Sequence, residues 1–147
     1  MAHSYAGNFV HCVFSTKERR STIPAESQEK LWAYLLGIAR NHKIELLAAG
    51  GTTNHVHLLL SLPPAMALAV AIQKLKANSS RWLSEHGSAF EWQKGYGAFS
   101  VSASQLSAVQ NYIQTQPEHH KKHTFEDEFI SLLQKYGVKY EAGQVFG

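Results

Sequence analysis

The sequence predicts an α+β domain in which helices pack on an antiparallel β-sheet. Three observations support this class: apolar stretches of strand length alternate with stretches of helical periodicity, the 147 residues are 44% hydrophobic, and the predicted elements follow the order β-α-β-β-α-β. That order is the split βαβ, ferredoxin-like arrangement, followed here by two C-terminal helices. Because about 100 to 200 residues is the usual size of one domain, we expect a single domain over residues 1–147.

The first half of the chain predicts three strands and one helix. Residues 8–15 are almost continuously apolar, which is typical of a strand buried on both faces. A proline suited to a first helical turn opens residues 24–41, where apolar residues recur at helical spacing. Residues 44–49 and 55–62 are two further apolar runs, so we expect a hairpin with its turn at residues 50–54.

The second half predicts three helices and one short strand. A proline pair opens residues 63–86, which carry apolar side chains on one helical face. A short strand should end near Val101, and Ser102 or Ser104 can cap the helix that follows. Residues 124–137 predict a last helix, with a threonine cap at its start and a glycine at its end.

The composition excludes several kinds of site. With one aspartate, Asp127, the chain cannot build a dyad of paired aspartates, and with one cysteine, Cys12, it cannot form an intramolecular disulfide or a cysteine-rich zinc site. The net charge is +3, with 12 basic and 7 acidic residues (+5) in residues 1–123 and 2 basic and 4 acidic residues (−2) in residues 124–147. The basic part is compatible with a nucleic-acid partner.

The sequence shows no signal for secretion or for a membrane. Its first residues lack a basic segment followed by an apolar one, so we expect no signal peptide and a cytoplasmic protein. Residues 46–73 carry no charge, but polar residues and two prolines interrupt them, which indicates a buried core instead of a membrane span.

Two histidines on a predicted strand are candidate metal ligands. His55 and His57 are two residues apart, so both side chains should project from the same face while Val56 points to the other. The alternative, two polar residues on a solvated strand face, has about even weight for such a pair taken alone. The apolar run after His57 places the pair at one end of a buried strand and favours the metal site.

A tyrosine and a glutamine form a second candidate pair. Tyr112 and Gln116 lie four residues apart on a predicted helix, so a phenol and an amide should emerge from one face. For the tyrosine alone, a packing role is the more common explanation. Pro117 disfavours helical geometry at Gln116, so we expect a kink there.

Several motifs together resemble the small HUH single-tyrosine transposases of bacterial insertion sequences, over nearly the whole chain. They are, in chain order, Val13-Phe14-Ser15-Thr16-Lys17, His55-Val56-His57, Lys76-Ala-Asn-Ser-Ser-Arg81, Trp92-x-x-Gly-Tyr96, Tyr112 with Gln116, and Gln116-x-Glu118-His119-His120. One departure is Asn54, which stands where relatives often carry an aspartate, so a carboxylate is absent there.

The resemblance implies a DNA transposase that cleaves and rejoins single-stranded DNA at hairpin-bearing element ends. Tyr112 would be the nucleophile, and a 5′-phosphotyrosine would be the intermediate. The resemblance also implies a metal held by His55 and His57 with Gln116 as third ligand, and we expect Mg²⁺, with Mn²⁺ as substitute. Family members work as homodimers, so a homodimer is expected, with the supply of Tyr112 in cis or in trans left open.

Basic and aromatic residues are candidates for DNA binding, although each basic residue taken alone is more often a solvated surface charge. The candidates are Lys17, Arg19, Arg20, Lys74, Arg81, Trp92, Lys94 and Tyr96. Three further histidines could contact phosphate or be exposed helix-end residues: His119, His120 and His123.

Two alternatives to a mobile-element transposase remain open from the sequence. One is a domesticated relative of the same chemistry that acts on dispersed palindromic repeats. The other is a non-catalytic nucleic-acid-binding module of ferredoxin-like fold, in which the histidine pair is incidental.

Overall fold

A four-stranded antiparallel sheet forms the centre of the protein. The computed structural model describes residues 3–86 and 89–147. The order of the strands across the sheet is β2-β3-β1-β4, and every neighbouring pair is antiparallel. The strands are β1 (Phe9–Ser15), β2 (Glu45–Gly51), β3 (His55–Ser61) and β4 (Gly97–Val101). The predicted ferredoxin-like α+β fold is confirmed.

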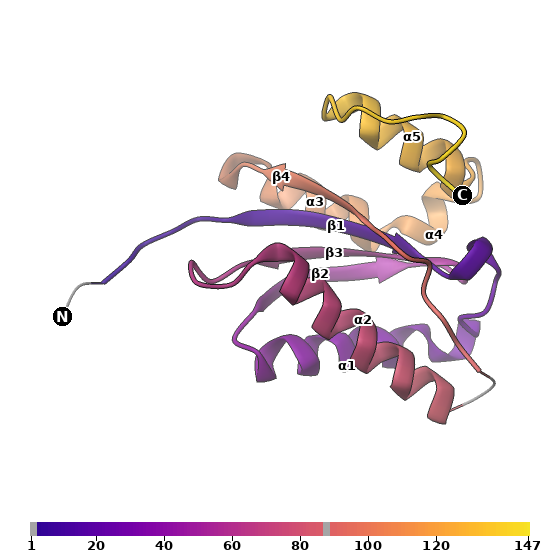
Figure 1. The fold of residues 1–147 in the computed structure, drawn as a ribbon, viewed down its shortest axis with the longest axis horizontal. Helices are drawn as coiled ribbons and strands as arrows, with labels where there is room; N and C mark the ends of the chain where they lie inside the picture. The colour runs from indigo at the N-terminus through magenta and orange to yellow at the C-terminus, as the bar shows by residue number, and fades with distance from the viewer. Residues whose placement is uncertain (1–2, 87–88) are drawn as a thin grey trace.

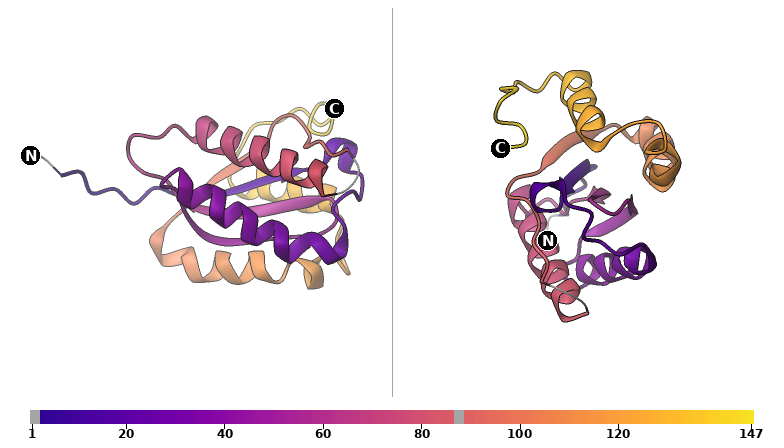
Figure 2. Two further views of the ribbon diagram at one scale, coloured as in Figure 1. Left: turned by 90° about the horizontal axis from the view of Figure 1, so that it is seen from below. Right: turned by 90° about the vertical axis from the view of Figure 1, so that its right-hand side faces the viewer.

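Helices cover both faces of this sheet. Figures 1 and 2 show helices on either side of it. The first side carries α1 (Gln28–Asn41) and α2 (Leu68–Glu85), and the second carries α3 (Leu106–Gln114), α4 (Gln116–His119) and α5 (Phe125–Lys135). Short 3₁₀ turns occupy Lys17–Arg19, Ala25–Ser27 and Ala103–Gln105.

Alternation along β1 and β3 separates an apolar core from a polar cluster. On one face, six buried residues pack against α1 and α2: Val10, Cys12, Phe14, Val56, Leu58 and Leu60. On the other face lie His11, His55 and His57, which are equally buried. The sheet therefore presents three imidazoles to the layer that contains α3, α4 and α5.

The C-terminal helix docks on this second face of the sheet. Thr124 caps α5, as predicted, because its hydroxyl accepts a hydrogen bond from the backbone N–H of Asp127. Phe125, Leu132 and Leu133 of α5 then pack with Val13 and Phe99 of the sheet.

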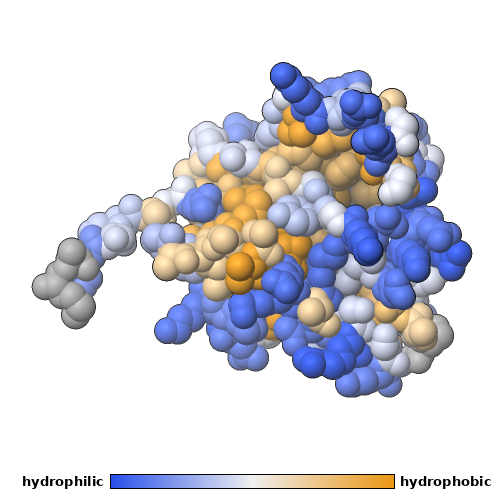
Figure 3. All heavy atoms as spheres, viewed as in Figure 1, coloured by the Kyte–Doolittle hydropathy of each residue, from blue (hydrophilic) through white to orange (hydrophobic). Residues whose placement is uncertain are grey.

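In Figure 3 blue, hydrophilic residues cover much of the outer surface, whereas orange, apolar ones are visible in the middle of this view.

Three predicted boundaries were wrong. Gly50 and Gly51 belong to β2 instead of a turn, and α2 begins at Leu68, because residues 63–66 form a turn closed by the bond from the Met66 N–H to the Pro63 carbonyl. The hydroxyls of Ser102 and Ser104 bond to each other, 2.9 Å apart, and cap no helix.

The kink expected at Gln116 lies one residue earlier, because Gln116 is the first residue of α4. Thr115 separates α3 from α4. Cys12 is buried and free. Within residues 3–86 and 89–147, no helix combines the length and the apolar character needed to cross a bilayer.

Candidate active site

The candidate site lies between the sheet and the three C-terminal helices. His55 and His57 reach it from β3, with His11 beside them on β1, because each side chain points to the same face of the pleated sheet. Gln116 enters from the start of α4, where it is fully buried. The solvated strand face considered for the histidine pair is therefore wrong, since both imidazoles have no exposed surface.

The structure brings the three candidate metal ligands together. His55 Nε2 lies 3.0 Å from Gln116 Oε1. His57 Nε2 lies 2.9 Å from Oε1 of Glu128, which in turn accepts a hydrogen bond from Gln116 through its other oxygen, Oε2, at 2.9 Å. The amide and both imidazoles thus meet around the carboxylate of one further residue.

Glu128 and His120 are members of this cluster that the sequence patterns did not single out as site residues with these roles. Glu128 comes from α5 and is only 4% exposed, and His120 follows α4. His120 Nε2 lies 2.9 Å from Gln116 Oε1 and 3.1 Å from Glu128 Oε1. One donor atom from each of His55, His57, His120 and Glu128 falls within 4.8 Å of the others.

Each of the three imidazoles in this cluster is oriented by a bond at its other nitrogen. Nδ1 of His55 lies 2.8 Å from Asn54 Oδ1, and Nδ1 of His57 lies 2.8 Å from His11 Nε2. Nδ1 of His120 donates to the His123 carbonyl at 2.7 Å. Histidines that bind metals are usually held in this way, with Nδ1 bonded to a partner and Nε2 turned to the ion. The residues present therefore fit a divalent cation.

Burial keeps His11 and His55 neutral, and a histidine that binds a metal, as His55 would, must be neutral. Burial lowers the pKa of His55 to about 3, and burial together with the neighbouring His57 lowers the pKa of His11 to about 3. Burial would raise the pKa of Glu128, but hydrogen bonds from His120, His57 and Tyr112 outweigh it and hold that pKa below its ordinary range. Glu128 is therefore ionised at neutral pH.

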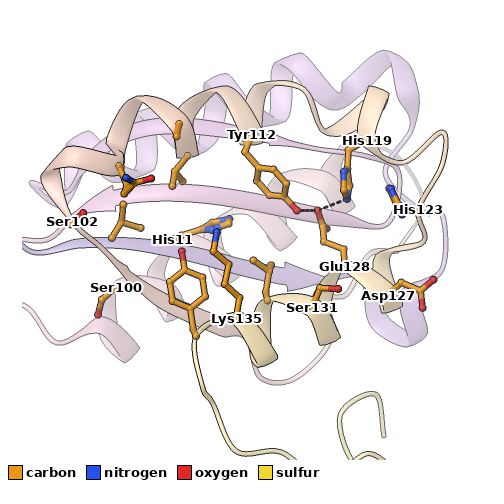
Figure 4. A pocket seen from close by; sticks show the side chains of 16 residues that line it. His11, Ser100, Ser102, Tyr112, His119, His123, Asp127, Glu128, Ser131 and Lys135 are labelled. Carbon is orange, nitrogen blue, oxygen red and sulfur yellow. Dashed lines mark hydrogen bonds and ion pairs between the residues drawn. The ribbon is translucent and has the colours of Figure 1, made fainter.

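Tyr112 stands beside this cluster and faces a cavity. Its hydroxyl donates a hydrogen bond to Glu128 Oε2, and its ring centroid is 5.7 Å from that of His57. Burial, then the hydrogen bond and charge of Glu128, raise the pKa of Tyr112 above its ordinary value. The cavity, of about 790 Å³, lies between α3 and α5, and Figure 4 shows Tyr112 and Glu128 in contact in its wall, with His119 and Lys135 also lining it.

The candidate DNA-binding residues fall in several places. Arg19, Lys94 and Tyr96 line a second cavity, of about 340 Å³, beside α5. Lys17 pairs with Glu91 at 3.2 Å, and Arg20 pairs with Glu18 at 2.7 Å. Lys74 and Arg81 lie on α2, in the layer on the opposite side of the sheet from Tyr112.

The prediction that Trp92 binds DNA is wrong, because its side chain is buried. Its indole is 8% exposed, and its N–H donates to Ser79 Oγ at 3.0 Å. The rings of Phe14 and Phe90 lie edge-on to it, each with a centroid distance of 4.8 Å. Trp92 is therefore part of the core and offers no face on which a DNA base could stack.

Comparisons with known proteins agree with this arrangement. Residues 5–116 match the family described as Transposase IS200 like. The transposase for insertion sequence element IS200 of Salmonella typhimurium is 27% identical over 129 residues, covering 82% of this chain and 84% of the relative. The ISDra2 transposase TnpA of Deinococcus radiodurans is 26% identical over 114 residues, covering 72% of this chain and 81% of the relative.

Two solved structures resemble the fold. A putative transposase from Deinococcus radiodurans superposes with a TM-score of 0.62 at 26% identity and covers 79% of this chain and 96% of that one. A REP-associated tyrosine transposase bound to a REP hairpin gives a TM-score of 0.61, covers 82% of this chain and 74% of that one, and, at 16% identity, supports the fold alone. Since the family match spans most of the chain and the site geometry accompanies it, this protein belongs to the family of IS200-like transposases.

Proposed function

We propose that this transposase cleaves and rejoins single-stranded DNA at hairpin-bearing element ends, through a 5′-phosphotyrosine on Tyr112. The observation that carries the proposal is the position of the Tyr112 hydroxyl, which lies in the wall of an open cavity and is bonded to the cluster that contains His55 and His57. A tyrosine transposase of similar fold has been solved bound to a REP hairpin, and by analogy we propose a hairpin as the substrate here.

In the cleavage step, Tyr112 Oη forms a bond to the scissile phosphorus while the bond from phosphorus to the 3′ oxygen breaks. The phenol gives up its proton, and Glu128 Oε2 is the acceptor that the hydroxyl contacts in this structure. The departing 3′ oxygen takes up a proton and becomes a 3′-hydroxyl. Because a phosphodiester is exchanged for another phosphodiester, attack by a different 3′-hydroxyl rejoins DNA without an external energy source.

His55, His57 and Gln116 would hold a divalent cation in this site. When bound, it would polarise the scissile phosphate and offset the charge that develops on its oxygens. We propose Mg²⁺, with Mn²⁺ as substitute. Because of the imidazole nitrogens, Mn²⁺ should be the more tightly bound ion of the two. The buried bonds at Nδ1 of both histidines would fix their rings before the ion arrives.

Basic and aromatic side chains around the two cavities would contact the DNA. Lys135 and His119 line the cavity beside Tyr112, where the strand that carries the scissile phosphate would enter. Arg19, Lys94 and Tyr96 border the other cavity, where phosphates and an unpaired base would bind. The remaining candidates, Lys17, Arg20, Lys74 and Arg81, would contact more distant phosphates of the hairpin.

We further propose a homodimer in solution. Within one chain, the Tyr112 ring lies close to that chain's own His57, which supports a complete site in cis. Mixing Tyr112→Phe and His57→Ala subunits tests this directly. Recovery of activity in the mixed dimer would mean that Tyr112 serves the partner's site.

The main experiment is a covalent-adduct assay. Purified protein is incubated with labelled single-stranded hairpins from its flanking DNA, with and without Mg²⁺ or Mn²⁺, and resolved on a denaturing gel. Tyr112→Phe should abolish the adduct and keep hairpin binding, and His57→Ala should lose cleavage while the fold remains intact. Tyr34→Phe is the matched control, because Tyr34 stacks on Trp82 in the opposite layer.

The outcomes separate the alternatives. An adduct that persists in Tyr112→Phe would exclude Tyr112 as the nucleophile. If flanking hairpins bind with no metal dependence and no adduct forms with any of them, the protein is a binding module and the proposal fails.

A further inference from the structure

We infer that Glu128 is itself a ligand of the metal, through Oε1, while its other oxygen holds the nucleophile Tyr112. The inference deepens the proposed function and rests on it for the presence of a catalytic cation. Glu128 lies on α5, beyond the 5–116 segment that matches the family. Its assignment therefore comes from the geometry of this chain.

The distances around Glu128 Oε1 are those of neighbouring ligands on one ion. Oε1 is 2.9 Å from His57 Nε2, 3.5 Å from His55 Nε2 and 3.1 Å from His120 Nε2. Adjacent donors of an octahedral site with bonds of about 2.1 Å are separated by roughly 3 Å. Glu128 Oε1 thus lies where a ligand adjacent to His55 and His57 on the same ion would lie.

The hydrogen bonds of His120 point to a cation between the same atoms. Its Nδ1 must donate, because its partner is the carbonyl oxygen of His123. In a neutral imidazole Nε2 then carries a lone pair, yet it faces Gln116 Oε1 and Glu128 Oε1, which are both acceptors. A neutral His120 would therefore leave three electron-rich atoms facing one another, so either a proton on Nε2 or a cation between these atoms must complete the arrangement.

The contacts of His55 lead to the same requirement. Its Nδ1 faces Asn54 Oδ1 at 2.8 Å, so a neutral ring that donates a proton there has an unprotonated Nε2, which lies 3.0 Å from the acceptor Gln116 Oε1. A cation placed among these lone pairs would satisfy all of them at once.

Charge also assigns the role to Glu128. The two strand histidines and Gln116 are neutral donors, whereas Mg²⁺ and Mn²⁺ favour anionic oxygen. Among the residues that the structure describes, Glu128 supplies the one carboxylate in the cluster of candidate donors. A carboxylate that is 4% exposed would be costly to bury without a positive partner.

The second oxygen connects this ligand to the nucleophile. Glu128 Oε2 accepts hydrogen bonds from the Tyr112 hydroxyl and from Gln116 Nε2. One carboxylate can therefore bind the ion through Oε1 and position the hydroxyl through Oε2. Removing the hydroxyl should leave metal affinity unchanged, because that bond does not involve Oε1.

Metal affinity measured on the full chain without DNA tests the inference. Mn²⁺ is titrated into the protein and free Mn²⁺ is followed by electron paramagnetic resonance. Glu128→Gln should weaken Mn²⁺ binding by about tenfold or more. Glu126→Gln removes the same charge from an exposed position of the same helix, so it should bind like the wild type, as should Tyr112→Phe.

Three results would overturn the inference. They are a wild-type protein that binds no Mn²⁺, an unchanged affinity in Glu128→Gln, and equal losses in Glu128→Gln and Glu126→Gln, which would mean a general charge effect. Circular dichroism checks that each variant is folded. If Glu128→Gln does not fold, Glu128→Asp replaces it, since the shorter side chain should also lose affinity and retained affinity would contradict the inference.

The two proposals fail in different ways. Loss of Mn²⁺ affinity in Glu128→Gln together with no adduct in the wild type would keep the ligand and reject the proposed function. A metal-dependent adduct on Tyr112 with unchanged affinity in Glu128→Gln would do the reverse.

Discussion

Replacing Gly50 by alanine should displace α3, the helix that carries Tyr112. Gly50 lies in β2, opposite His57 of β3, and α3 crosses directly above it. A Cβ at this position would lie 2.2 Å from the carbonyl oxygen of Ile113 and 3.1 Å from its carbonyl carbon. Backbone atoms cannot rotate out of the way, so the helix and the strand must separate.

The size of the effect follows from that distance. Real Cβ atoms essentially never come closer than 3.0 Å to another heavy atom, so the contact at 2.2 Å must open by at least 0.8 Å. Overpacking of this kind costs about 1–3 kcal/mol of unfolding free energy. A displacement of about 1 Å at a catalytic group lowers the rate by roughly 100-fold, so adduct formation should slow by about that factor.

Two measurements check this prediction. Urea unfolding gives the change in stability, and single-turnover formation of the adduct gives the rate. Gly37→Ala is the matched control: nothing lies within 4 Å of its Cβ position on α1, so it should gain about 0.5–1 kcal/mol and keep the rate. A Gly50→Ala protein with the wild-type urea midpoint and rate would refute the packing argument.

Three more outcomes are expected. His11→Ala should weaken Mn²⁺ binding by about 10- to 100-fold while the fold persists, because His57 Nδ1 loses its partner, and unchanged affinity would contradict this. Metal-free protein should lose urea stability as pH falls below about 6.5, since unfolded histidine takes up protons there whereas the pKa values of His11 and His55 are lowered to about 3; a flat profile between pH 7.5 and 5 would argue against it. Lys94→Gln should reduce the salt dependence of hairpin binding by about one unit of slope, whereas Arg40→Gln on α1 should not.

Much of the fold was predictable because short-range patterns determine it. The almost continuous apolar character of β1 correctly predicted a strand buried on both faces, and the helical spacing in α1 identified its buried face. The glycine pair in β2 was misread because glycine is common in turns, whereas here Gly50 allows α3 to approach the sheet. Such a contact between distant segments leaves no local pattern in the sequence.

His55, His57, Tyr112 and Gln116 could be found from their spacing, because the two histidines share β3 and Tyr112 and Gln116 lie four residues apart on the consecutive helices α3 and α4. Glu128 could not. It follows Glu126 and Asp127 in the first turn of α5, where acidic residues commonly interact with the helix dipole and remain in solvent. Which of the three is buried depends on how α5 docks against Val13 and Phe99, and that is a tertiary contact.

The charge of Glu128 leads to a last prediction, on the pH dependence of stabilisation by metal. Without a cation, a protonated imidazole must compensate the buried carboxylate, and burial, which would lower the pKa of His120, is outweighed by Glu128, so that this pKa is raised. A raised pKa means that the stabilisation is present at low pH and is lost as pH rises above about 6.5 through the folded-state value. Mn²⁺ supplies positive charge at any pH and no longer competes with a proton when the imidazole is neutral. The increase in melting temperature caused by Mn²⁺ should therefore be larger at pH 8 than at pH 6.5 in the wild type, and this difference should shrink in Glu128→Gln. An equal increase at both pH values would show that Glu128 and His120 do not share a site with the ion.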